Sequence, residues 1–155
     1  MHNKITMGKV QKHMPWNWLA IGLFVLFYPM LISIYVFLPL FIGAISYMFV
    51  LGLAKEKTSY ILISSFFMMN LEVNLSLPVF LIIITSLFFY VLIYPSLTYF
   101  RKCKVCRPIL SVLLLDLLYL ASLFTYDFIF QTQSIVLDSI LLYSLVVDML
   151  IVVIL

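Results

Sequence analysis

A long apolar stretch between two groups of basic residues indicates the architecture of this chain. It runs from Lys55 to Lys102 and reads KEKTSYILISSFFMMNLEVNLSLPVFLIIITSLFFYVLIYPSLTYFRK. Inside its basic ends, Glu72 is the one charged residue. A helix rises about 1.5 Å per residue and the hydrocarbon core of a bilayer is about 30 Å thick, so one crossing takes roughly 20 residues. The stretch is therefore long enough for two membrane-crossing helices.

The rest of the chain repeats this pattern. Apolar blocks lie at about 16–54, 58–100 and 108–155, after a short basic tail at 1–15. Each block has about 40 to 48 residues, which is room for two crossings. Their Leu, Ile and Phe runs lack the alternation of barrel strands, which favours helices. The sequence predicts an all-α integral membrane protein with six transmembrane helices, built as three helical hairpins in a single domain.

Composition and charge support this prediction and give it a direction. Hydrophobic residues make up 66% of the chain and charged residues 10%, whereas a soluble domain has about 25% charged residues. This excludes a water-soluble globule, and the high hydrophobicity excludes a disordered chain. Even numbers of crossings place every basic cluster on one side, which the positive-inside rule makes cytoplasmic, together with both termini. The clusters are Lys4, Lys9 and Lys12; Lys55 and Lys57; and Arg101, Lys102, Lys104 and Arg107.

Polar residues and prolines predict where each hairpin turns. In the first block we expect helices at about 16–33 and 36–54, with the turn near 29–35. In the second block the polar break is 70–74, and Pro78 opens the next helix. In the third block the outer loop is 131–134.

Four aspartates in the third block are the most informative polar residues. Folding this block about its outer loop pairs Asp116 with Asp148 deep in the membrane, and Asp127 with Asp138 near the outer surface. Three interpretations of the deep pair remain open. The carboxyls are neutral and hydrogen-bonded to each other or to a neighbour such as Tyr119 or Ser144. They face a polar helix of another subunit, or they form a proton or cation path.

Other polar groups offer weaker indications. Glu72 and Asn70 lie in the polar break of the second block, where we expect either a solvated loop or a polar pocket. The basic loop carrying Arg101, Lys102, Lys104 and Arg107 predicts an orientation anchor that binds anionic lipid headgroups. Cys103 and Cys106 form an isolated C-x-x-C, for which we expect reduced thiols because a zinc site needs two further ligands.

The sequence does not favour an enzyme. The apolar blocks contain no His or Lys that could serve a membrane serine protease, and no H-E-x-x-H zinc motif or Gly-rich phosphate loop occurs. We expect no catalytic residue, cofactor or metal site, and no nucleic-acid partner. The helices are apolar on all sides and lack G-x-x-x-G, which favours a subunit that membrane lipids or partner helices complete.

The layout resembles the MreD family, the small multi-spanning subunit of the bacterial rod-shape complex. Matching features are the aromatic start of the first apolar block at 16–18, its basic end at 53–57, and the acid-bearing run Leu113–Leu118. The polar turn at 69–76 also matches in position, although Glu72 or Asn70 stands where family members usually carry Asp, and the last helix ends without a basic tail.

This resemblance implies a non-catalytic scaffold of the bacterial inner membrane. Its expected partner is the bitopic protein MreC, together with other membrane proteins of the elongasome, and its role is to help organise peptidoglycan synthesis and cell shape. The resemblance also implies a fold similar to the substrate-binding subunits of ECF vitamin transporters. Asp116, Asp148, Glu72 and Asn70 are the candidate contact residues. The alternative is a small transporter or substrate-capture subunit that uses Asp116 and Asp148 for proton or cation coupling.

Overall fold

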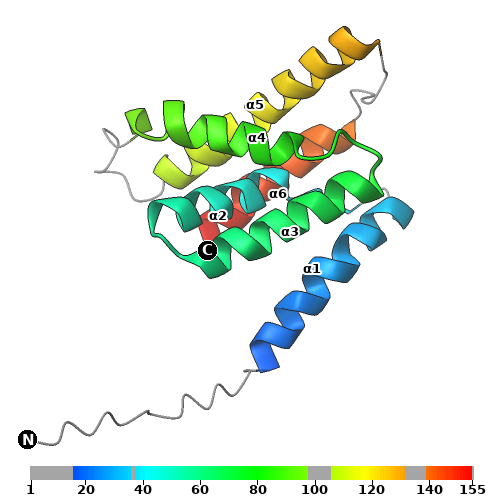
Figure 1. The fold of residues 1–155 in the computed structure, drawn as a ribbon, viewed down its shortest axis with the longest axis vertical. Helices are drawn as coiled ribbons and strands as arrows, with labels where there is room; N and C mark the ends of the chain where they lie inside the picture. The colour runs from blue at the N-terminus through cyan, green and yellow to red at the C-terminus, as the bar shows by residue number, and fades with distance from the viewer. Residues whose placement is uncertain (1–15, 36–37, 98–105, 132–138, 155) are drawn as a thin grey trace, which may run out of the picture.

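The computed structural model describes residues 16–35, 38–97, 106–131 and 139–154 (Figure 1). Over these residues the fold consists of α-helices without a β-strand, which confirms the all-α prediction. The six helices are α1 (Trp16–Ile34), α2 (Ile42–Ala54), α3 (Thr58–Asn74), α4 (Leu81–Phe88), α5 (Cys106–Phe130) and α6 (Ser139–Ile154). A π-helical turn, η1 (Phe89–Ile93), continues α4.

The helices differ in how far each could cross a bilayer. Among the described residues, α5 is the one helix that is long and apolar enough to cross unaided. Shorter apolar helices lie at Leu19–Ile34, Ile42–Ala54, Leu81–Ile93 and Tyr143–Ile154. A helix of 13 residues such as α2 is about 20 Å long, which is less than the roughly 30 Å hydrocarbon core. Its crossing would therefore need non-helical residues as well.

The first apolar block departs from the predicted boundaries. α1 continues through Pro29 and ends at Ile34, so the prediction of a turn beginning at residue 29 is wrong. α2 begins at Ile42 rather than at 36. Phe41, directly before it, has a left-handed backbone with φ of 53°, and Pro39 disfavours helical backbone at the residue preceding it.

α2 occupies the centre of the bundle. It contacts α3, α4, α5 and α6, and α5 in turn packs against α4 and α6 (Figure 1). α1 packs against α3 rather than α2, so the first block is not a simple packed hairpin. The core is formed by side chains that are almost fully removed from solvent, among them Val50, Phe67, Phe89 and Val112.

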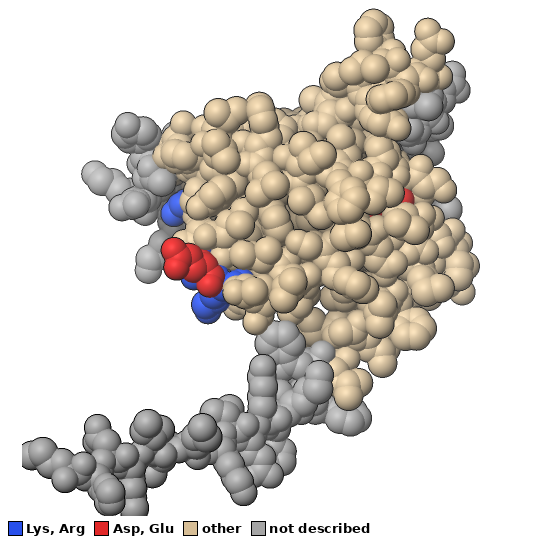
Figure 2. All heavy atoms as spheres, viewed as in Figure 1, with Lys and Arg blue, Asp and Glu red and all other residues tan. Residues whose placement is uncertain are grey.

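Among the described residues in view, the surface is almost entirely uncharged (Figure 2). Large apolar side chains are exposed along every α-helix except the central α2; they include Leu23, Leu62, Ile84, Leu117 and Leu150. Apolar exposure on this scale is unusual for a soluble monomer. The bundle therefore needs an apolar environment or partner around it.

The cations in the described part of the chain lie at one end of the bundle. Lys55 and Lys57 belong to the α2–α3 turn, and Arg107 is in the first turn of α5. Lys55 and Pro108 line the same cavity, which brings the second basic cluster beside the described part of the third. Both groups therefore share one end of the molecule, as the even helix count predicts.

Candidate functional site

Two helices begin directly after a residue with strained, left-handed backbone. Phe41 precedes α2 with φ of 53°, and Phe80 precedes α4 with φ of 71°. Left-handed backbone costs about 1–3 kcal/mol at a non-glycine residue, so the surroundings must stabilise it. The first N–H groups of each helix also lack partners within the helix. Neither helix start has a capping bond from the side chain of its own N-cap residue.

α6 supplies partners for the start of α2. The backbone N–H of Leu40 donates to Ser144 Oγ at 3.0 Å, and the N–H of Gly43 donates to Asp148 Oδ2 at 2.9 Å. Ser144 and Asp148 are four residues apart, so one face of α6 carries both acceptors. The carbonyl of Pro39 accepts from the Tyr28 hydroxyl at 2.8 Å. The non-helical residues just before α2 are thereby hydrogen-bonded to both α1 and α6.

Asp116 meets the same turn from α5. A Cβ placed on Gly43 would lie 2.5 Å from Asp116 Oδ1 and 2.6 Å from Oδ2, so the carboxyl occupies the space that any larger residue needs. The structure thus brings Asp116 and Asp148 together at Gly43. Gly43 lies about 18 Å along α2 from Lys55.

The neighbours of this pair differ from those expected. Ser144 bonds to the Leu40 backbone rather than to a carboxyl. Tyr119 is only 3% exposed, and its hydroxyl has no hydrogen-bond partner among the described residues. Asp116 is 9% exposed and Asp148 1% exposed, and one oxygen of each, Oδ2 and Oδ1 respectively, likewise lacks a described partner. Unpaired buried polar atoms are costly, so this centre has unused bonding capacity.

Glu72 supplies hydrogen-bond acceptors for the start of α4, as Ser144 and Asp148 do for the start of α2. Its side chain is fully buried, so the expectation of a solvated loop acid is wrong. Oε2 accepts from the N–H of Phe80 at 2.6 Å and Oε1 accepts from the N–H of Ile82 at 2.7 Å. Both carboxyl oxygens are therefore used by the backbone. The acid acts as a cap supplied from α3, eight and ten residues earlier in the chain.

Asn70 ties α3 to α1 at the proline. Pro29 has no N–H, so it leaves the carbonyl of Val25, four residues earlier, without its helical donor. Asn70 Nδ2 donates to that carbonyl at 3.1 Å and to the carbonyl of Leu26 at 3.0 Å. Asn74 Nδ2 donates to Asn70 Oδ1 at 2.7 Å, which fixes the amide in this orientation.

The other sequence-predicted residues lie elsewhere. Arg107 stacks on Tyr94, with the guanidinium carbon 4.7 Å from the ring centroid. Asp127 is half-buried in the last turns of α5, away from the deep pair. Cys106 is disulfide-bonded, so the expectation of a reduced thiol is wrong for it. Several predicted residues fall outside the described part of the chain: Arg101, Lys102, Cys103, Lys104 and Asp138.

Sequence reasoning missed Gly43 and the interruption that it follows. Gly43 is one of four glycines in the chain, and scarce glycine in an apolar helix indicates a close approach by another group. The spacing of Ser144 and Asp148 also indicated a polar face on α6. No pattern in the sequence showed which backbone groups these side chains would meet.

The arrangement can fix helix ends, and it can also hold a proton or small cation between two carboxyls. Within the described residues, no group of three or more His, Cys, Asp or Glu could coordinate a metal. Comparison of the chain with protein-family models, curated proteins and solved structures finds no match.

Proposed function

We propose that this chain is a non-catalytic, multi-pass subunit of the bacterial inner membrane, similar to MreD, that serves as a scaffold in the cell-wall elongation complex. Six helices, an apolar exterior and basic residues gathered at one end support a membrane location. In this proposal the shorter helices cross the bilayer together with half-buried non-helical residues such as 38–41. Non-helical backbone is tolerated at membrane depth where protein surrounds it.

One observation carries the choice of scaffold over transporter. Transporters with interrupted helices use the free helix N-termini to bind charged groups of the substrate. Here the chain's own carboxylates occupy those positions, with Asp148 on α2 and Glu72 on α4. Asn70 is likewise used within the chain. The polar residues of the interior thus hold helices in fixed places, which suits a rigid platform for partner helices.

A second candidate keeps the deep pair as a coupling site. Asp116 Oδ2, Asp148 Oδ1 and the Tyr119 hydroxyl are buried and lack described partners. A small transporter or substrate-capture subunit could load a proton or cation at these atoms. Glu72 is a poorer candidate for this task, because both of its oxygens accept backbone hydrogen bonds.

Two measurements on the full-length chain separate these candidates. The first is mild purification from native membranes, followed by identification of what copurifies. The second is proton flux into proteoliposomes, comparing wild type with Asp116→Asn and Asp148→Asn. The exposed acid variant Glu56→Gln is the matched control.

The scaffold predicts a stoichiometric bitopic partner and no flux that depends on the aspartates. Assembly with that partner should be similar in wild type and Glu56→Gln. A chain that purifies alone and shows ion-dependent flux abolished by both Asp variants would refute the scaffold and support the transporter.

A further inference from the structure

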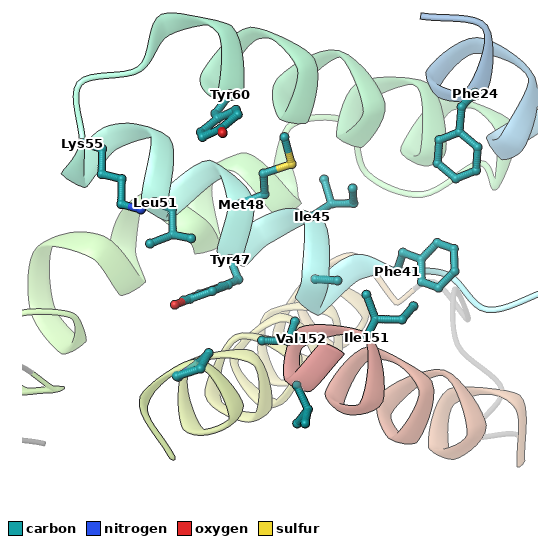
Figure 3. A pocket seen from close by; sticks show the side chains of 13 residues that line it. Phe24, Phe41, Ile45, Tyr47, Met48, Leu51, Lys55, Tyr60, Ile151 and Val152 are labelled. Carbon is teal, nitrogen blue, oxygen red and sulfur yellow. The ribbon is translucent and has the colours of Figure 1, made fainter. Parts of the chain in front are cut away.

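A cavity of about 740 Å³ runs along α2 on the side facing α1 and α6 (Figure 3). Residues of α2 form its floor, and its walls include Phe24 of α1, Tyr60 of α3, and Ile151 and Val152 of α6. Sites for small organic molecules span about 300–1,000 Å³, so this volume admits a substantial ligand. The cavity is separate from the Asp116–Asp148 pair, neither of which lines it.

The cavity has a polar end and an apolar end. Figure 3 shows Lys55 at one end, with Tyr47 and Tyr60 in the nearer half, and Phe24 and Phe41 at the other end. Lys55 is the one charged residue that lines it. This pattern fits an amphiphile with an anionic head beside Lys55 and a hydrocarbon tail directed toward Phe41.

Among the described residues, Lys55 is the cation left for such a head. Lys57 lies over the ring of Tyr60, with Nζ 5.2 Å from the centroid, and Arg107 is stacked on Tyr94. Neither lines the cavity. Glu56 is the acid adjacent to Lys55 in sequence, and it too is outside the lining.

The cavity is long enough for one lipid tail. From Phe41 to Lys55 the helix rises about 21 Å, whereas one leaflet contributes about 15 Å of hydrocarbon depth. Lys55 belongs to the basic end, where the proposed topology places the cytoplasmic headgroups. A tail entering beside Lys55 can therefore extend along α2 within the apolar walls.

We propose that this cavity binds one anionic glycerophospholipid, with its phosphate at Lys55 and an acyl chain along α2. The inference rests on the membrane location in the proposed function. Alkaline carbonate extraction of native membranes tests that location separately. Release of the chain into the supernatant would refute the proposed function, whereas an integrated chain without lipid preference would refute the lipid site alone.

The test uses native mass spectrometry of the full-length chain in detergent, titrated with phosphatidylglycerol or with phosphatidylcholine of the same acyl chains. Wild type should retain the anionic lipid preferentially. Lys55→Gln should lower its retention about fivefold, the effect of one cation near an anionic headgroup. The matched control Lys57→Gln should change retention less than twofold. Equal retention of the two lipids, or equal effects of the two Lys variants, would overturn the proposal.

A second pair of variants tests where the tail lies. Met48→Trp adds bulk to the cavity wall and should lower retention of both lipids. Ala121→Trp adds even more bulk, but to a different apolar groove between α4 and α5, and should leave retention unchanged. If Met48→Trp leaves lipid retention intact but releases a copurifying protein, the cavity holds a partner helix and the proposal is wrong.

Discussion

Replacing Glu72 with Gln should destabilise the protein at one identifiable place. Glu72 is fully buried and accepts hydrogen bonds from the N–H groups of Phe80 and Ile82 at 2.6 and 2.7 Å. Glutamine has one acceptor oxygen, and its NH₂ group would face the second backbone N–H. Losing a hydrogen bond to a charged acceptor while leaving the donor buried costs about 2 kcal/mol.

This cost should be visible as a change in melting temperature. For a chain of this size, 1 kcal/mol corresponds to about 2–4 °C, so Glu72→Gln should lower Tm by about 4–8 °C. The assay heats the detergent-solubilised protein and measures the monodisperse fraction that remains by size-exclusion chromatography. Glu56→Gln makes the same chemical change at an exposed acid and should leave Tm nearly unchanged.

Hydrogen exchange locates the effect. If Glu72 caps α4, its replacement should speed amide exchange at the start of α4, while α2 exchanges as in wild type. A Tm equal to that of Glu56→Gln would refute the reasoning. Faster exchange spread evenly over both helices would do so as well, because it would show a general loss of packing rather than a lost cap.

The remaining predictions concern the other two polar junctions. Gly43→Ala should lower the stability by about 1–3 kcal/mol, because the added Cβ would meet the Asp116 carboxyl. Gly22→Ala is the control, since nothing lies within 4 Å of its added Cβ, and it should be neutral or slightly stabilising in the same thermal assay. Asn70→Leu should lower the stability by about 1–3 kcal/mol, because the Val25 carbonyl, which Pro29 leaves without a helical donor, would lose the hydrogen bond from Asn70. That cost should shrink in a Pro29→Ala background, and an additive double-mutant cycle would show that Asn70 does not serve this carbonyl.

The sequence was informative about helices and poor about their interruptions. Apolar blocks between basic clusters predicted six helical segments because hydrophobic length is a local property. Hydropathy did not reveal the break before α2, since residues 38–41 are as apolar as the helices beside them, and Pro39 was the one local signal of it. Hydropathy cannot distinguish buried helix from buried irregular backbone. Only the hydrogen bonds to Tyr28 and Ser144 show that backbone polar groups of this non-helical segment have partners.

The site shows the same division between local and distant information. Spacing about the outer loop predicted that Asp116 and Asp148 approach each other, because two antiparallel helices convert sequence distance into depth. Glu72 was misread because its neighbours Asn70 and Asn74 make the segment resemble a solvated turn. Its partners are backbone groups, which carry no residue-specific signal. The pairing of Asn70 with the carbonyl freed by Pro29 depends on α1 packing against α3, a tertiary contact between distant segments.

The left-handed residues before α2 and α4 and the acids that bond these helix starts have a common physical origin. Phe41 and Phe80, each with left-handed backbone, directly precede a helix whose first N–H groups have no partner within the helix. An acid from another helix is the strongest acceptor available, so the buried carboxylates follow from the interrupted helices themselves. Loss of function in an acid variant therefore does not identify a transport site unless stability is unchanged. The Asp116–Asp148 pair is the better place to seek coupling, because within the described part of the chain each of its members keeps one oxygen without a hydrogen-bond partner, whereas both oxygens of Glu72 are bonded.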